Sequence, residues 1–377
     1  MSLFLLAHVP IFLYLLFRLV VPLKASKVTK WLAALVLLLV SQHYVVRRVL
    51  GYMATPELPG LFISIEGWAF ASTLFAFVLL VLLDATALLR RCVAGKKRLP
   101  GSTFSANRRL FMIGVAASAP AAYGVGRAVS LPEVVRSEIR LAKLAPAQNG
   151  LRLVQLTDLH ASPLFDRAWM QGLVARVNAL EPDLVLFTGD MADGKAGRRR
   201  ADLEPLAKLQ SKYGVFGCVG NHEYYSGYAA MLDILESVGI RMLLNSHARI
   251  QVGGADIVVA GLTDGAAAGF GLPLPDVAAA LAGAPENALR ILLDHKPGNA
   301  AANALAGADF QLSGHTHGGH ILGMDLLVAR FNAGFVRGWY TVNGMPLYVS
   351  PGAGLWNGFP VRIGVPGEIS HITLQSA

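Results

Sequence analysis

The chain has 377 residues, of which 54% are hydrophobic and only 15% are charged. A soluble globular domain usually contains about 25% charged residues, so this composition excludes a wholly soluble protein as well as a largely disordered one. The length is sufficient for one membrane region followed by one sizeable globular domain.

The net charge of +9 is distributed unevenly along the chain. Residues 1–150 carry 17 Lys and Arg against 5 Asp and Glu, which is a net charge of +12, whereas residues 151–377 have a net charge of −3. The basic excess lies in the apolar half, as in membrane proteins whose Lys and Arg flank the spans. Nucleic-acid binding needs a basic exposed face on the globular half, so nucleic acid is excluded as a partner. Composition sets no oligomeric state.

Four apolar stretches precede residue 131. A membrane span needs about 20 apolar residues, and charged loops separate these stretches from one another. Together they predict a membrane region over residues 1–130 with about four transmembrane helices. The stretches are Leu3–Leu23, Trp31–Val46, Leu61–Leu89 and Leu110–Val129.

The loops between these stretches differ in positive charge. The first and third loops together contain ten Lys and Arg, whereas the second contains two, Arg47 and Arg48. The positive-inside rule places the first and third loops in the cytoplasm, so everything after residue 130 is predicted on the periplasmic or extracellular side of a bacterial inner membrane. Arg108-Arg109 is either part of an internal segment that resembles a twin-arginine export signal or an ordinary positive flank. Both readings export the C-terminal domain.

Residues 131–150, with alternating Glu and Arg, are predicted to form an amphipathic helix or linker. From residue 151 to 377 the pattern changes to short runs rich in Val, Ile and Leu, with helix-like stretches such as Ala168–Leu180 and Ala229–Val238 between them. This alternation is typical of a layered α/β domain with strands buried on both faces. The predicted strands are Leu151–Thr157, Leu184–Thr188, Val215–Val219, Ile257–Leu262, Leu289–Leu293, Phe310–Leu312 and Leu347–Val349.

Polar motifs follow five of these apolar runs, where ligands bind in open α/β sheets. Six of the ten histidines belong to them, and buried imidazole and carboxylate groups are costly unless they are paired or bind metal. Mixed oxygen and nitrogen donors suit Mn²⁺, Fe or Zn²⁺ better than Mg²⁺ or Ca²⁺. The motifs are Asp158-Leu-His160, Gly189-Asp190-Met-Ala-Asp193, Gly220-Asn221-His222-Glu223, Asp294-His295 and Gly314-His315-Thr-His317-Gly-Gly-His320.

This ordered series resembles the calcineurin-like metallophosphoesterase superfamily. The version Gly-His-Thr-His-Gly-Gly, with Ser350-Pro-Gly-Ala-Gly and Pro360-Val-Arg further on, is most similar to a bacterial subgroup of membrane-attached phosphoesterases. The resemblance implies a four-layer α/β/β/α sandwich, preceded here by the all-α membrane region, with a dinuclear metal site between its sheets.

The resemblance also implies roles for the motif residues. Asp158, His160 and His317 would hold one divalent ion, Asn221, His295 and His315 would hold the second, and Asp190 would bridge both. Mn²⁺ is the favoured metal, with Fe or Zn²⁺ as alternatives, and a metal-bridging hydroxide would attack phosphorus while His222 donates a proton. The subgroup often has Gln where this chain has His320, so His320 is, with Arg362, a candidate substrate contact. Asp193 is either an acceptor that orients a ligand histidine or a helix cap.

A membrane region beside such a site predicts hydrolysis of a phosphodiester or pyrophosphate bond in a lipid or lipid-linked substrate. A pyrophosphate of the UDP-diacylglucosamine type is one candidate, although that substrate is cytosolic and requires the opposite topology. The alternative is a catalytically silent membrane receptor or scaffold with a phosphoesterase fold, which loss of ligands would mark. No ligand of the implied set is missing from the sequence.

Overall fold

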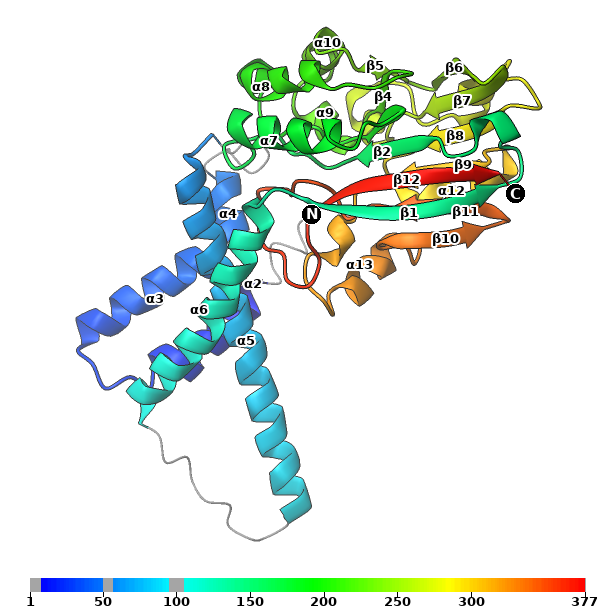
Figure 1. Cartoon of the computed structure of the whole chain (residues 1–377). Coiled ribbons are helices and arrows are strands. Elements are labelled where there is room, and N and C mark those ends of the chain that lie inside the picture. Colours follow the sequence, from blue (N-terminus) through cyan, green and yellow to red (C-terminus); the bar gives the residue numbers. More distant parts are fainter. Residues whose placement is uncertain (1–7, 50–56, 95–104, 377) are drawn as a thin grey trace. The chain divides into compact units, whose positions relative to one another are not determined.

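The structure is a computed structural model that describes residues 8–49, 57–94 and 105–376 (Figure 1). The chain divides into two compact units. The helical unit comprises Met1–Met53, Gly60–Gly126 and Gly358–Val361, and the α/β unit comprises Ala54–Pro59, Arg127–Asn357 and Arg362–Ala377. The main division at residue 126 lies close to the predicted end of the membrane region at residue 130, but each unit also takes a short segment from elsewhere in the chain.

The helical unit consists of apolar helices of unequal length. Its helices are α2 (His8–Leu15), α3 (Lys27–Ser41), α4 (His43–Val49), α5 (Gly60–Ala94) and α6 (Ala106–Val129). Ser26 caps α3 by accepting a hydrogen bond from the backbone N–H of Thr29. Among the described residues, one helix, Gly60–Val93, is long and apolar enough to cross a membrane, and α3 with α4 would add a second only if this pair, bent by 74°, forms one span.

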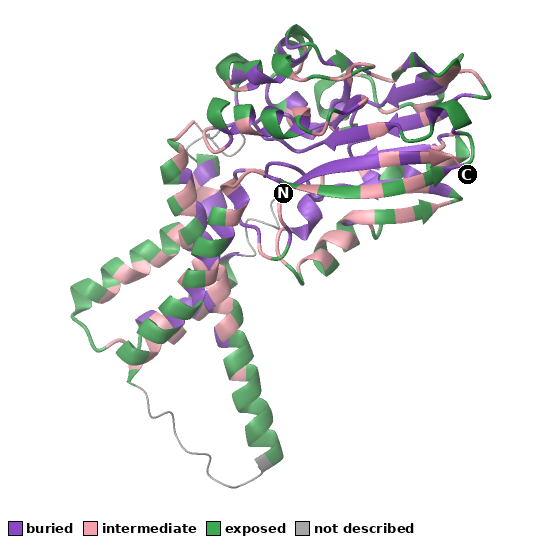
Figure 2. Cartoon of the chain, in the orientation of Figure 1, coloured by how far each residue is buried: buried purple, intermediate pink, exposed green. Residues whose placement is uncertain are grey.

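The other predicted spans have a different outcome. Part of the first stretch, residues 3–7, lies outside the described residues, and α2 is short. Helix α6 begins four residues before the predicted stretch and ends with it at Val129, and it contains Pro120 and many Ala and Gly residues. The C-terminal part of α5 is exposed (Figure 2), and its exposed side chains include Leu82, Leu88 and Val93. An apolar helix without a protein partner on most of its surface suits a lipid environment.

The described residues of the α/β unit form two six-stranded sheets, ordered β1-β12-β2-β3-β4-β5 and β10-β11-β9-β8-β7-β6. The strands are β1 (Glu133–Leu141), β2 (Arg152–Leu156), β3 (Leu184–Thr188), β4 (Val215–Cys218), β5 (Arg241–Met242), β6 (Ser246–Val252), β7 (Ala255–Gly261), β8 (Leu289–Leu293), β9 (Phe310–Ser313), β10 (Gly338–Val342), β11 (Met345–Val349) and β12 (Glu368–Ser376). The helices are α7 (Arg167–Asn178), α8 (Ala196–Leu203), α9 (Asn221–Tyr225), α10 (Tyr228–Ser237), α11 (Val277–Leu281), α12 (Ala300–Leu305) and α13 (Asp325–Phe331).

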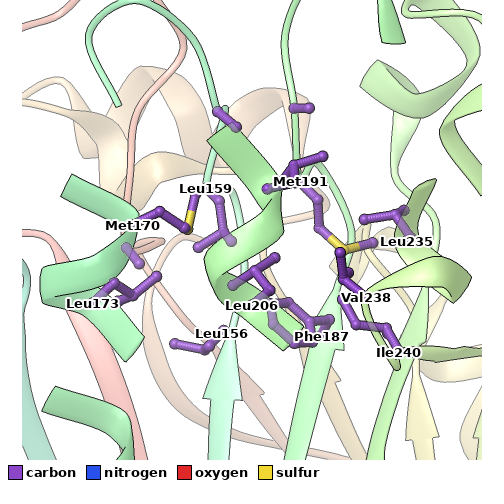
Figure 3. Packing of buried hydrophobic residues seen from close by; sticks show 14 of the residues in the cluster. Leu156, Leu159, Met170, Leu173, Phe187, Met191, Leu206, Leu235, Val238 and Ile240 are labelled. Atoms are coloured by element: carbon purple, nitrogen blue, oxygen red, sulfur yellow. The ribbon is translucent and has the colours of Figure 1, made fainter. Parts of the chain in front are cut away.

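The two sheets pack face to face and helices cover their outer faces. Strand β3 shows the pattern, because Leu184 and Leu186 point into the core between the sheets, whereas Val185 and Phe187 point toward the helices. Both faces are therefore apolar, which explains the uninterrupted hydrophobic run. Figure 3 shows this outer core, where Phe187 lies with side chains of α7 and α10. Helices α11 and α12 cover the second sheet. The four-layer α/β/β/α sandwich is confirmed.

Residues 131–150 correct one prediction. They contain β1, an edge strand paired in parallel with β12 over nine residues, rather than an amphipathic helix or linker. The charged residues of β1 are exposed because an edge strand has one face and one edge open to water. A distant partner, the C-terminal strand, makes this segment a strand, and the local sequence does not reveal that partner.

Candidate metal centre

The predicted site residues follow the carboxyl ends of five strands. Strands β2, β3 and β4 are parallel neighbours in the first sheet, and β8 and β9 are parallel neighbours in the second. Since the carboxyl ends of parallel strands meet at one edge, the loops that follow them converge. The sequence pattern of apolar runs followed by polar motifs thus becomes two groups of side chains at one end of the sandwich.

The first group contains Asp158, His160 and His317, whose candidate ligand atoms all lie within 4.8 Å of one another. Asp158 Oδ1 is 3.8 Å from His160 Nε2 and 3.6 Å from His317 Nε2. All three residues are buried. Burial alone would raise the pKa of Asp158, but the facing imidazoles, His317 first, lower it, so the carboxylate is ionised and ready to bind a cation.

The second group contains Asp190, His295 and His315, again with candidate ligand atoms within 4.8 Å of one another. Asp190 Oδ2 is 3.1 Å from His295 Nε2 and also 3.9 Å from His160 Nε2 of the first group. His295 Nδ1 lies 2.7 Å from the carbonyl oxygen of Thr188, which fixes the ring with Nε2 toward Asp190. This carboxylate oxygen therefore faces a histidine of each group.

Asn221 completes the predicted set, and the hydrogen-bond inventory tests whether a metal fits. Among the described residues, four buried atoms of the predicted ligands have no hydrogen-bond partner, namely Asp158 Oδ1, His160 Nε2, Asn221 Oδ1 and His317 Nδ1. Leaving a buried polar atom unpaired costs about 1–3 kcal/mol. Carboxylate, imidazole and amide donors are the ones that divalent transition metals accept, so these residues fit a metal centre.

The backbone at the site is strained in a way that aims these side chains. Five of the predicted ligands are non-glycine residues with positive φ, a conformation that costs roughly 1–2 kcal/mol per residue. Such strain gathers at functional sites, where the surrounding structure holds it in place. The five are Asp158 (φ 53°), His160 (φ 47°), Asp190 (φ 55°), His315 (φ 72°) and His317 (φ 48°).

Glu223 holds two of the loops together, a role that the sequence reasoning missed. Its buried carboxylate accepts hydrogen bonds from the backbone N–H groups of Gly220 (2.6 Å), Asp190 (3.0 Å) and Met191 (2.7 Å). Gly220 has to be glycine there, because a Cβ at that position would lie 2.8 Å from the backbone nitrogen of Asp190. The Gly-Asn-His-Glu motif contains this signal, since the glutamate closes the loop that carries Asn221.

Asp193 is an acceptor that orients two imidazoles, which decides between its two predicted roles. Its Oδ1 lies 2.9 Å from His160 Nδ1 and 2.6 Å from His222 Nδ1, and its Oδ2 accepts a hydrogen bond from Asn357 Nδ2 at 3.0 Å. Burial would raise the pKa of Asp193, but His160 and His222 lower it. Nδ1 of both rings is thereby committed to Asp193, and Nε2 is free to face the site. Asn357 was not predicted and has no motif of its own.

Asp193→Asn tests this positioning role. The amide has the size of the carboxylate but lacks its negative charge, so it accepts hydrogen bonds from the two imidazole rings less strongly. We therefore expect the Mn²⁺ concentration for half-maximal activation to rise about 10–100-fold. A metal titration of the purified chain measures it. Asp233→Asn, at an exposed position on α10, is the matched control and should leave the titration unchanged. An unchanged metal requirement in Asp193→Asn would contradict the assignment.

His222 lies at the edge of both groups, with Nε2 4.0 Å from Asp190 Oδ2 and a partly exposed side chain. Burial lowers the pKa of His222, but Asp190 and Asp193 outweigh burial and raise it. The two carboxylates therefore favour the protonated form of the ring. A partly exposed imidazolium beside buried ligands is suited to donate that proton to a leaving group.

The two candidate substrate contacts have different surroundings. The ring of His320 lies 5.1 Å from that of His317 and is therefore next to the first group. Arg362 is 1% exposed, and its guanidinium donates to the carbonyl oxygens of Pro351 (2.8 Å), Gly352 (3.1 Å) and Gly354 (2.7 Å). These bonds correct the expectation for Arg362, because they give it a structural role in holding a loop instead of an open face toward substrate.

Comparisons with known proteins agree with this geometry. The model of a family described as calcineurin-like phosphoesterase matches residues 151–319, the segment that contains all seven predicted metal ligands. The chain is 37% identical over 270 residues to a Danio rerio protein named transmembrane protein with metallophosphoesterase domain, covering 68% of this chain and 60% of that protein. It is 35% identical over 253 residues to an uncharacterized metallophosphoesterase of Campylobacter jejuni, covering 67% and 65%.

A third relative is covered more fully. The chain is 31% identical over 236 residues to an uncharacterized metallophosphoesterase of Aquifex aeolicus, covering 61% of this chain and 87% of that protein. By contrast, the chain spans less than two thirds of the length of the relatives from Danio rerio and Campylobacter jejuni. The residues that the family model matches, 151–319, lie in the α/β unit. With the relative from Aquifex aeolicus, this match shows that the chain belongs to the calcineurin-like metallophosphoesterase family.

Proposed function

We propose that the chain is a metal-dependent phosphoester hydrolase that works at a membrane. The observation that carries the proposal is the convergence of six oxygen- and nitrogen-bearing side chains into two adjoining groups, in which Asp190 of the second group also faces His160 of the first. Six of the seven implied ligands lie in these groups, which argues against a silent receptor or scaffold.

The residues divide into two ligand sets in this proposal. Asp158, His160 and His317 would hold one divalent ion, Asn221, His295 and His315 the other, and Asp190 both. Two such ions supply an activated water at neutral pH and a clamp for the phosphate oxygens. Manganese is our proposed metal. Mg²⁺ and Ca²⁺ prefer ligand sets made only of oxygen, whereas this set mixes oxygen with imidazole nitrogen, which suits Mn²⁺ better.

The protein side chains contribute orientation and a proton. Asp193 and the carbonyl of Thr188 hold the His160 and His295 rings in fixed directions. His222 donates its Nε2 proton to the oxygen of the leaving group. Its Nδ1–H remains on the ring, hydrogen-bonded to Asp193. Burial of the carboxylates excludes bulk water from the ligand groups, which strengthens their electrostatic effect on the phosphoester.

Metal removal and restoration test the proposed function. The full chain stripped of metal with a chelator should not hydrolyse bis-p-nitrophenyl phosphate. Turnover should return when Mn²⁺ is added, because the attacking water is activated only when metal ions are bound. Release of p-nitrophenol measures the rate. Full activity of the stripped protein would contradict the proposal, and Mg²⁺ restoring more activity than Mn²⁺ would contradict the choice of metal.

For the substrate we propose a phosphodiester or pyrophosphate of a lipid or lipid-linked molecule. Helix α5 supports it, since a chain that enters a bilayer keeps its α/β unit near lipid. The periplasmic placement rests on the charge of the predicted loops and favours a phospholipid over a cytosolic pyrophosphate of the UDP-diacylglucosamine type. The proposed location is the bacterial inner membrane.

Reporter fusions test this location. Alkaline phosphatase fused after the C-terminus should be active, and a fluorescent protein that folds only in the cytosol should be dark, because the α/β unit is proposed outside the cytoplasm. Enzyme activity and fluorescence of intact cells give the result. A bright fluorescent fusion together with an inactive phosphatase would reverse the topology.

A further inference from the structure

An exposed apolar surface lies on α13 in the α/β unit. We call it the α13 surface and define it by Leu322, Leu326, Leu327 and Phe331, whose residues are 59%, 81%, 59% and 79% exposed. None of the residues of α13 is buried. Covering each such side chain would gain about 1.5–3 kcal/mol, so four of them exposed within residues 322–331 mark an interaction surface.

Helix α13 is fixed to the loop that carries His315 and His317. A Cβ at Gly319 would lie 2.8 Å from Asp325 Cα, so the loop and the start of the helix touch through their backbones. Arg337 joins them from the other side, donating to the carbonyl oxygen of Gly318 at 2.6 Å and lying 3.6 Å from Asp325 Oδ2. Whatever binds the α13 surface is therefore held next to the metal centre.

A cavity of about 690 Å³ connects this surface to the metal centre. Its lining combines ionisable residues, among them His315 of the second ligand group, Lys296 and the buried Asp294, with the exposed apolar residues Leu274 and Phe331. Lys296 forms an ion pair with Asp264 at 2.8 Å, so this part of the cavity wall is polar. A site that is ionic inside and apolar at its exposed end suits an amphiphile with a phosphate at one end.

Two further observations favour a bilayer as the occupant of the α13 surface. The same chain carries the apolar helix Gly60–Val93, so a bilayer is part of its surroundings. Arg330 lies on α13 between the apolar residues, is exposed, and has no ion pair within the part of the chain that the structure describes. A cation beside apolar side chains complements the anionic headgroups and acyl chains of a membrane surface.

We propose that the α13 surface docks on the bilayer and admits a lipid phosphoester to the cavity beside His315. The docking is a property of the surface itself, and the entry of a lipid substrate rests on the proposed function. Leu326, Leu327 and Phe331 enter the headgroup region, Arg330 meets anionic headgroups, and the phosphate reaches the metal centre through the cavity.

The test places a fluorophore on the α13 surface of the full chain. Cys92 is exposed and is first replaced by Ser, whereas Cys218 is buried and is retained. Leu326→Cys is labelled with an environment-sensitive dye in vesicles of phosphatidylcholine with a minority of phosphatidylglycerol. Glu236→Cys on α10, which lies at the opposite end of the α/β unit in Figure 1, is the control. Quenching by a spin-labelled phospholipid is compared with quenching by aqueous iodide.

Docking predicts that spin-labelled lipid lowers the emission of the dye at position 326 about twofold and leaves that at position 236 unchanged, because docked interfacial residues lie about 5–10 Å deep. Iodide should show the reverse order. Equal iodide quenching at both positions would overturn the proposal, and so would a dye at position 326 that neither quencher reaches, since a protein or a second copy would then cover it.

Hydrolysis of bis-p-nitrophenyl phosphate by the same labelled samples separates the two proposals. Lipid quenching without hydrolysis would keep the docking surface and remove the proposed enzyme. Hydrolysis with iodide quenching at position 326 would keep the enzyme and remove the docking surface. Hydrolysis together with lipid quenching is the result that both proposals predict.

Discussion

Asp190→Asn should lower the turnover of bis-p-nitrophenyl phosphate by about 10³-fold or more while the protein still folds. Asp190 Oδ2 lies 3.1 Å from His295 Nε2 and 3.9 Å from His160 Nε2, so it is the atom that the two ligand groups share. An amide at this point removes the negative charge that would face both cations. Because the flanking imidazoles lower the pKa of Asp190 despite its burial, the charge is present throughout the neutral range.

Folding of this variant can be checked separately. The backbone N–H of His222 donates to Asp190 Oδ1 at 2.8 Å, and an amide oxygen can accept the same bond. We therefore expect a thermal midpoint close to that of the wild type when both are measured without metal. Asp233→Asn is again the control. Turnover within a few-fold of the wild type in Asp190→Asn would remove the bridging assignment.

His222→Gln should have the second largest effect, and its size should depend on the leaving group. General acid catalysis contributes about 10²–10⁴-fold, so hydrolysis of diphenyl phosphate, whose phenolate leaves poorly, should fall by that factor. Bis-p-nitrophenyl phosphate should lose much less, since p-nitrophenolate departs without a proton. The ratio of the two losses, measured under saturating Mn²⁺, distinguishes proton donation from damage to the metal centre.

The pH profile provides an independent check on His222. Asp190 and Asp193 raise the pKa of His222 above its ordinary value of 6.5 despite burial. The donating form is therefore present below that raised pKa and is lost as the pH rises through it. Wild-type hydrolysis of diphenyl phosphate should fall on this alkaline side, and the fall should be absent in His222→Gln. Equal losses on both substrates with an unaltered profile would contradict the proton-donor role.

Much of the fold could be predicted because its strands are buried on both faces. The apolar runs Leu184–Thr188 and Leu289–Leu293 are strands with the predicted bounds. Strand β1 was wrongly predicted because its partner β12 is more than two hundred residues away in sequence. Edge strands with exposed charged residues resemble surface helices or linkers when the sequence is considered alone.

The candidate site could be located for a related reason. Polar residues that directly follow buried strands are predictable, and the five motifs meet where parallel strands end. Supporting residues are harder to predict, because Asn357 has no motif and contacts Asp193 only through the fold. Arg362 looked like a phosphate contact in the sequence, but only the structure shows the carbonyl oxygens that surround it.

The metal content of the active, purified full chain tests the central claim most directly. Elemental analysis should find two transition-metal ions per chain in the wild type, with Mn²⁺ restoring both after stripping, and fewer than two in Asp190→Asn, because both ligand groups share that carboxylate. An enzyme that turns over bis-p-nitrophenyl phosphate with no bound transition metal would contradict the account.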